Sequence, residues 1–178
     1  TVENYRNKVI EAYPENHEQV LELYPVKTDE DVKMAATQLA SDRFISYSTW
    51  KWAELHNQNS EKSIYLYNFA RIRPTDPKSS YKPAGAGHAS EIEYFLGNLS
   101  NENFPFLEKE DFQISEVIQQ YLVNFIKSGN PNSAGLKEWP SMLDTQTPSL
   151  MIMDQNFQVI ESKTEDRFRF HDSYYGNN

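Results

Sequence analysis

The run "SIYLYNFA", residues 63–70, constrains the fold of this chain more than any other stretch. It is a continuous series dominated by β-branched, aromatic and aliphatic residues, bounded by polar segments on both sides. Such runs are typical of strands that are buried on both faces, and strands of this kind occur in parallel sheets covered by helices. The stretch therefore predicts a buried strand and an α/β class of fold.

A long segment rich in turn-forming residues follows this strand. From Ala70 to Gly87 the chain contains three prolines and two glycines and shows neither helical nor strand periodicity. Loops of this length inside compact domains are usually functional or disordered. Helical spacing then returns in four apolar residues: Ile92, Phe95, Leu96 and Leu99. Ser90 and Glu93 have the spacing of a capping box, so we expect a helix that begins at Glu91 with Ser90 as its N-cap.

His88 lies between the loop and this helix, two residues before the predicted N-terminus. The positive end of a helix dipole disfavours an imidazolium ion, which favours a neutral side chain that can accept a proton. Glu91 and Glu93 in the first turn would offset part of that field. A purely structural alternative stays open, in which His88 is a loop histidine that binds a backbone carbonyl, because the context of strand, loop and helix is not specific on its own.

Other segments complete the expected order of elements. Thr28 is a predicted N-cap for a helix whose apolar face comprises Val32, Ala35, Ala36, Leu39 and Ala40. A second helix is expected from about Ser46 to His56. The strongest helical pattern is "ISEVIQQYLVNFIKSGNP", with one face formed by Val117, Ile118, Tyr121, Leu122, Phe125 and Ile126, and with Gly129 and Pro131 ending it. The last block, "SLMIMDQNFQVIESK", predicts a β-hairpin.

The composition excludes several classes of partner. With 17 basic and 26 acidic residues the net charge is −9, and no basic stripe is present, so we expect binding neither to nucleic acid nor to an anionic membrane. No window approaches eighteen apolar residues, and the first ten residues lack the hydrophobic core of a signal peptide. We therefore expect a soluble chain, and its compartment, whether secreted, periplasmic or cytoplasmic, stays open. The absence of cysteine does not decide between them.

Metal and nucleotide cofactors have no support in the sequence. The four histidines, His17, His56, His88 and His171, do not follow a metal-ligand spacing. The six glycines form neither a dinucleotide fingerprint nor a phosphate-binding loop. Acidic clusters such as "TDEDV" are best interpreted as solvated helix starts. The tryptophans, Trp50, Trp52 and Trp139, are more typical of a core than of a ligand pocket.

Several ordered motifs carry a resemblance to a known family. "SIYLYNFA", then "GAGHASEIEYFLGNL", then "VIQQYLVNFIKSGNPNSAGLKEWPSM" resemble the C-terminal part of type-B carboxylesterases, the cholinesterase-like branch of the α/β-hydrolases. "LELYP" at residues 21–25 and the terminal hairpin are also similar to that family, so the resemblance covers nearly the whole chain. It implies that His88, in the GxxHxxE segment, is the general base of a Ser-His-acid triad. It also implies that residues 63–70 form the last parallel strand of the central sheet.

The sequence departs from this family at the nucleophile. No GxSxG motif and no oxyanion loop with paired glycines occurs in the 178 residues, and no position before His88 matches the family's acidic-residue motif. In α/β-hydrolases the serine and the acid both precede the histidine in the chain. We therefore expect residues 1–178 to be a single C-terminal segment of an α/β-hydrolase domain, in which helices surround one or more strands and a hairpin ends the chain. The part that bears the nucleophile and the acid would be absent.

Two classes of function stay open. The first is the C-terminal part of a serine carboxylesterase that acts on a small-molecule ester. Its partner would be the N-terminal remainder of the same hydrolase, and residues 1–178 alone would be inactive and could self-associate through the strand. The second is a non-catalytic, cholinesterase-like interaction module. An upstream GxSxG motif would favour the esterase, and a replaced serine would favour the module.

Overall fold

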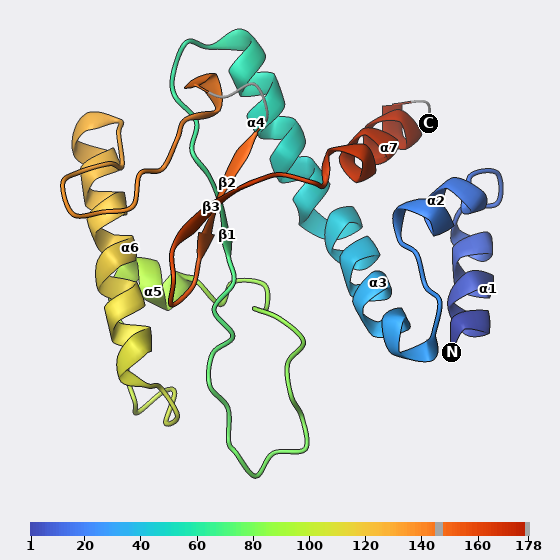
Figure 1. Ribbon diagram of the computed structural model, residues 1–178, viewed down its shortest axis with the longest axis horizontal. Helices are drawn as coiled ribbons and strands as arrows, with labels where there is room; N and C mark the ends of the chain where they lie inside the picture. Colours follow the sequence, from blue (N-terminus) through green and yellow to red (C-terminus); the bar gives the residue numbers. More distant parts are fainter. Residues whose placement is uncertain (145–147, 177–178) are drawn as a thin grey trace. The chain divides into compact units, whose positions relative to one another are not determined.

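The computed structural model describes residues 1–144 and 148–176, and they form two compact units. The helical unit comprises residues 1–60 together with the segment from Lys163 onward, and the sheet unit comprises residues 61–162. Figure 1 shows the elements of each unit in chain colours.

Five α-helices build the helical unit: α1 (Val2–Ala12), α2 (His17–Leu23), α3 (Asp29–Ser41), α4 (Tyr47–Asn59) and α7 (Glu165–Gly176). α3 runs into α4 through a π-helical turn, Asp42–Ser46. The predicted start at Thr28 is confirmed, because its side chain and that of Asp31 form a capping box. The predicted face of α3 is confirmed in part: Ala35 and Leu39 are buried, whereas Ala40 is exposed because the helix turns it away from the core.

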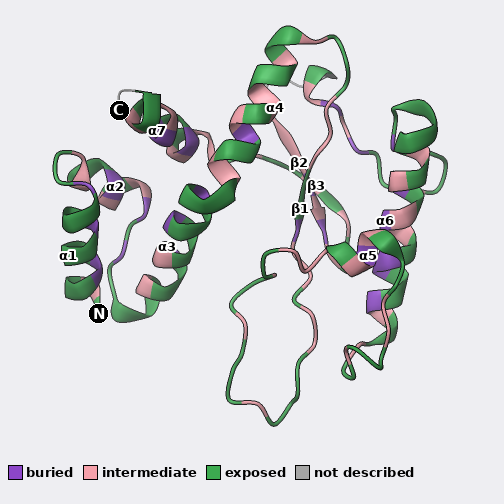
Figure 2. Ribbon diagram, turned by 180° about the vertical axis from the view of Figure 1, so that it is seen from behind, coloured by how far each residue is buried: buried purple, intermediate pink, exposed green. Residues whose placement is uncertain are grey.

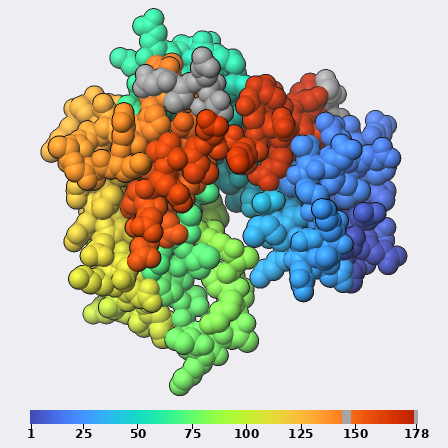
Figure 3. All heavy atoms as spheres, viewed as in Figure 1, coloured from blue at the N-terminus to red at the C-terminus, as the bar shows by residue number. Residues whose placement is uncertain are grey.

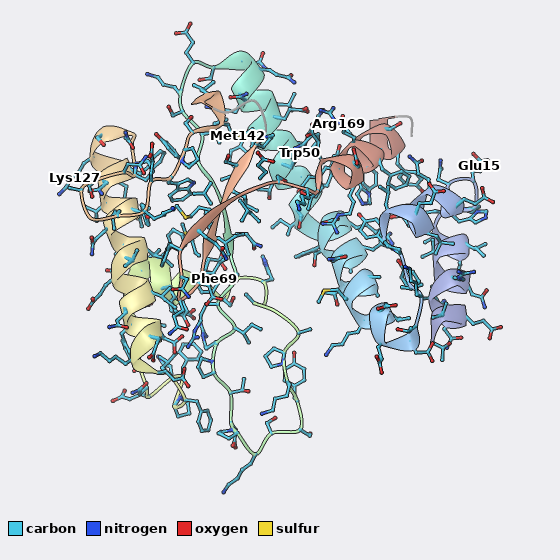
Figure 4. The ribbon with its side chains drawn as sticks, viewed as in Figure 1. Glu15, Trp50, Phe69, Lys127, Met142 and Arg169 are labelled. Atoms are coloured by element: carbon cyan, nitrogen blue, oxygen red, sulfur yellow. The ribbon has the colours of Figure 1, made fainter. Side chains whose placement is uncertain are left out.

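Helix α7 was not expected from the sequence. In "DRFRFHD" the aromatic residues alternate with charged ones, which is closer to a strand pattern than to a helical one. Burial against the rest of the unit outweighs that local pattern, since Phe168, Phe170 and His171 are all buried. Phe168 lies against Trp50 of α4, with ring centroids 5.6 Å apart, and Figure 4 labels Trp50 on the side of α4 that α7 packs against.

The sheet unit contains three strands in the order β1-β2-β3: β1 (Leu66–Phe69), β2 (Ser149–Met153) and β3 (Gln158–Glu161). β1 pairs with β2 in parallel, with Leu66 opposite Leu150, and β2 pairs with β3 in an antiparallel hairpin. The parallel pairing of the strand and the hairpin are therefore as predicted. Two details are wrong: β2 is parallel to β1 and comes later in the chain, so residues 63–70 are not the last parallel strand, and helix α7, not the hairpin, ends the described residues. Burial of the strand on both faces is wrong, because Tyr67 and Asn68 are exposed. β1 has a strand neighbour on one edge only among the described residues, and this leaves it less covered than an inner strand.

Helices α5 (Ile92–Leu96) and α6 (Lys109–Ser128) pack together in the sheet unit, and a 3-10 turn, Met142–Asp144, precedes β2. The buried face of α6 includes Ile114, Ile118 and Tyr121, and Figure 2 shows the buried positions of α6 on the side that carries α5. The end at Gly129 is confirmed by its left-handed backbone, with φ 74°. Phe125 and Ile126 were expected on the buried face, but both are exposed in the last turn of α6, where Phe125 lies at the edge of the Tyr65 ring.

No helix within residues 1–144 and 148–176 is long and apolar enough to span a membrane.

Candidate functional site

His88 lies on an exposed turn at the end of the long loop that follows β1. The Ser90 amide donates a hydrogen bond to the Gly87 carbonyl at 3.2 Å, which closes a four-residue turn around His88 and Ala89. Ala89 has φ 63°, a left-handed backbone that favours glycine and costs an alanine about 1 kcal/mol. The loop extends beyond α6 in Figures 1 and 3, and most of its residues are exposed in Figure 2. The imidazole is therefore accessible on a locally constrained turn.

The helix after His88 begins later than predicted. α5 starts at Ile92 with Glu91 as its N-cap, and no side chain caps it. The predicted capping box of Ser90 and Glu93 is wrong, because the Glu93 carboxylate accepts a hydrogen bond from Arg73 at 2.7 Å instead. His88 therefore lies four residues before a helix of only five residues, too short for the strong dipole that the prediction assumed.

The expected apolar face of this helix is also wrong in part. Ile92 and Leu96 are exposed, whereas Tyr94 is fully buried. The Tyr94 ring packs at a tilt against Phe69 at the end of β1, with ring centroids 4.8 Å apart, and Figure 4 labels Phe69. This contact keeps α5 beside the carboxyl end of β1, so the turn of His88 returns to the same end of the strand from which the loop departs.

Arg73 joins the start of the loop to its end. One of its terminal nitrogens, Nη2, lies 2.9 Å from the Ser90 carbonyl oxygen and 2.7 Å from the Glu93 carboxylate. Its guanidinium also lies over the Phe104 ring, 3.8 Å from the centroid. The Nε atom of Arg73 and the hydroxyl of Ser90 are buried without a hydrogen-bond partner among the described residues. The pKa of Glu93 is lowered: burial raises it, but the hydrogen bond and charge of Arg73 outweigh that effect.

A second arginine after β1 binds a buried aspartate in α6. Arg71 Nε donates to Asp111 Oδ1 at 2.7 Å and its Nη2 donates to Oδ2 at 3.2 Å. The Tyr94 hydroxyl and the Glu108 amide also donate to this carboxylate, at 2.7 and 2.8 Å. Burial raises the pKa of Asp111, but these hydrogen bonds outweigh it and the net pKa is lowered. The cluster therefore fixes β1, α5 and α6 to one another.

The helical unit buries another polar cluster around His171. The Tyr24 hydroxyl donates to Asp42 Oδ2 at 2.8 Å and lies 2.9 Å from His171 Nε2. Since the hydroxyl proton is used on Asp42, Nε2 carries the imidazole proton and Nδ1 is left as an acceptor, buried without a partner among the described residues. Burial, aided by the charges of Arg43 and Arg167, lowers the pKa of His171 to about 4. The neutral ring is therefore the form that fits this core.

The structure does not bring the histidines together into a metal site. No group of three or more potential ligands occurs in the described part of the chain. The prediction that the tryptophans belong to the core is confirmed for Trp50 and Trp139, which are buried, and wrong for Trp52, which is 76% exposed. A hollow of about 970 Å³ lies in the helical unit, and its lining includes Glu15 and Arg169, both labelled in Figure 4. His88 is not among its lining residues.

Sequence reasoning missed Arg71, Arg73, Asp111 and Tyr94 as neighbours of the candidate site. The only local signal was "NFARIRP", in which two arginines at alternate positions follow an apolar strand. In an extended segment, this alternation puts the two arginine side chains on one face. It does not indicate their acceptors, Asp111 and Glu93, which lie 40 and 20 residues further along the chain.

The chain is similar in sequence to known carboxylesterases. The sequence profile of the carboxylesterase family matches residues 1–171. Carboxylesterase 4A of Bos taurus is 30% identical over 118 residues, which cover 63% of this chain and 20% of that protein. Cocaine esterase of Homo sapiens is 31% identical over 86 residues, covering 48% of this chain and 15% of that protein.

A solved structure of PNB esterase has the same fold over most of the chain. The TM-score is 0.64 at 21% sequence identity, and the match covers 94% of this chain and 33% of that structure. The predicted fold class, a portion of an α/β-hydrolase with helices around strands and a hairpin, is confirmed. The chain spans about a fifth or less of the length of these curated relatives and a third of the structural one.

Proposed function

Because this chain belongs to the carboxylesterase family, we propose that it is the C-terminal part of a carboxylic ester hydrolase and that His88 is the general base of a Ser-His-acid triad. The serine, the acid and the oxyanion hole would come from an N-terminal remainder of the same hydrolase, since the 178 residues contain no GxSxG motif. The substrate would be a small-molecule carboxylic ester.

The observation that carries the proposal is the position of His88. It is exposed, it lies on a closed turn, and the helix that follows packs on Phe69 at the carboxyl end of a parallel strand. Reactive groups of open α/β sheets lie beyond the carboxyl ends of the strands. An accessible imidazole at this place can reach a serine presented there by another strand.

The chemistry of such a base is acyl transfer. The neutral imidazole of His88 would take the proton of the serine hydroxyl as its oxygen attacks the ester carbonyl, and it would return this proton to the leaving alcohol. Water would then attack the acyl-enzyme, with the same nitrogen taking its proton, and release of the carboxylic acid would restore the serine. A carboxylate bound to the other ring nitrogen would hold the tautomer that this cycle needs.

The proposal is tested by turnover of p-nitrophenyl acetate. His88→Gln in the full-length protein should lower kcat by about a thousandfold or more, with folding little changed. His56→Gln, an exposed histidine of α4, is the matched control and should keep kcat. Residues 1–178 alone should hydrolyse the ester no faster than free imidazole. A full-length His88→Gln protein with near-normal kcat would contradict the role of His88, and a full-length protein without any turnover would favour the interaction module.

A further inference from the structure

We propose that Arg73 is a positioning residue for His88: by joining the two ends of the loop, its guanidinium holds the turn that carries the imidazole. This inference rests on the proposed function, and it adds a residue to which neither the sequence motifs nor the comparisons assign a role.

Arg73 closes the loop that carries His88. Arg73 lies four residues after β1 ends, and Ser90 lies two residues after His88. The contact of Arg73 Nη2 with the Ser90 carbonyl at 2.9 Å therefore spans the loop between them. This contact ties the start of the loop to the turn that carries His88, and it adds to the packing of Ala86 on the core of the sheet unit.

The Arg73 side chain is itself held in place. Its side chain is largely buried, with 18% of its surface exposed, and it is held by two acceptors on one nitrogen and by the Phe104 ring beneath its plane. Arginine suits this place because its planar group can stack on a ring and donate hydrogen bonds at the same time. A lysine could donate hydrogen bonds to the same acceptors but lacks the planar group that lies over the Phe104 ring.

The turn that carries His88 is strained at Ala89. Ala89 has φ 63°, and a non-glycine residue keeps such a backbone only when its surroundings impose it. Arg73 donates a hydrogen bond to the backbone carbonyl of Ser90, the residue directly after Ala89. The direction of this carbonyl depends on the dihedral angle of Ala89. The hydrogen bond of Arg73 and the strained turn together set the direction of the peptide that follows His88.

The consequence for catalysis is geometric. A general base must lie within hydrogen-bond reach of the proton that it abstracts, and an error of about 1 Å costs on the order of a hundredfold in rate. Loss of Arg73 leaves the chemistry of the imidazole intact but widens the range of positions that it occupies. The loss should therefore fall on kcat and not on substrate binding.

The test uses the full-length protein and counts active sites with a phosphate triester that phosphorylates the reactive serine. Arg73→Met should lower kcat per titrated site about 10- to 100-fold with KM nearly constant. Arg73→Lys should recover part of this loss. Arg43→Met is the matched control, since Arg43 also lies over an aromatic ring, that of Tyr13 in the helical unit, and it should keep kcat per site. Glu93→Gln keeps an acceptor for Arg73 but removes its charge, and it provides a milder variant, with a loss below tenfold, should Arg73→Met fold poorly.

The outcomes separate this inference from the proposed function. If Arg73 has only a structural role, its variants will have fewer titratable sites but an unchanged kcat per site, and that result overturns the inference. If His88→Gln keeps its activity, the proposed function fails and the inference fails with it. If His88→Gln is inactive while Arg73→Met and Glu93→Gln both keep kcat per site, the proposed function stands and the role of Arg73 is refuted.

Discussion

The helical unit and the sheet unit each bury one aspartate beside an arginine and a tyrosine, yet the pKa values of the two carboxyls shift in opposite directions. Asp111 of the sheet unit accepts four hydrogen bonds, and its pKa is lowered although burial opposes this. Asp42 of the helical unit accepts from the Tyr24 hydroxyl and has Arg167 Nε 3.1 Å away, and burial outweighs both, so its pKa is raised. The two sites show that a nearby cation alone does not decide the direction in which the pKa of a buried carboxyl shifts, and that the number of well-placed hydrogen-bond donors matters as well.

The largest expected effect comes from removing the arginine of the better bonded pair. Arg71→Met leaves a buried carboxylate without its cation, and we expect a loss of about 3–5 kcal/mol in the free energy of unfolding. Arg167→Met in the helical unit should cost only about 1–2 kcal/mol, because Asp42, whose pKa is already raised, can take up a proton. Hydrogen exchange of amides in α6 and α4 would measure the two losses separately. Equal losses would show that the count of donors does not matter.

The next effect is the pH dependence of the helical unit. The pKa of buried His171 is lowered to about 4, below the ordinary 6.5, so the unfolded chain binds more protons than the native chain between these values. Stability should therefore fall as the pH is lowered through this window, by about 3 kcal/mol in all. His171→Gln, which stays neutral, should remove this slope. Asp42 acts in the opposite direction, because its raised pKa makes the native state the better proton binder, and only the difference between the wild type and His171→Gln isolates the histidine.

Two tyrosine substitutions sharpen the comparison further. Tyr24→Phe removes the donor of Asp42 and the partner of His171 together, and we expect a cost of about 2–3 kcal/mol. Tyr94→Phe removes one of four donors to Asp111 and should cost about 1 kcal/mol. Urea denaturation of each variant measures these values. A larger loss for Tyr94→Phe would mean that the four bonds of Asp111 act cooperatively and not as independent donors.

The sequence could predict features that depend on partners close along the chain, and it could not predict those that depend on distant partners. The N-cap at Thr28, the end of α6 at Gly129 and the hairpin of β2 and β3 depend on neighbours within a few residues, and all three are confirmed. The capping box at Ser90 failed because the partner of Glu93 is Arg73, 20 residues earlier in the chain. The pairing of Tyr24 with His171 spans 147 residues, so no spacing rule could have indicated it. His88 was identified through the resemblance of its segment to a family, and its role stays a prediction.

The smallest expected effect concerns two serines of the sheet unit whose hydroxyls are buried, one with a hydrogen bond and one without. The Ser115 hydroxyl donates to the Tyr94 carbonyl at 2.7 Å, whereas the Ser90 hydroxyl is buried without a partner among the described residues. Ser115→Ala should therefore cost about 1 kcal/mol, since it leaves a buried carbonyl with one donor fewer. Ser90→Ala should change the free energy of unfolding by less than about 0.5 kcal/mol, because the alanine keeps the backbone carbonyl that Arg73 binds and removes a group that already lacks a partner. Urea denaturation of both variants checks the pair. A loss of about 1 kcal/mol or more at Ser90 is what a true helix N-cap would cost, so that result would restore the capping box that the sequence predicts and contradict the arrangement of Glu93 with Arg73.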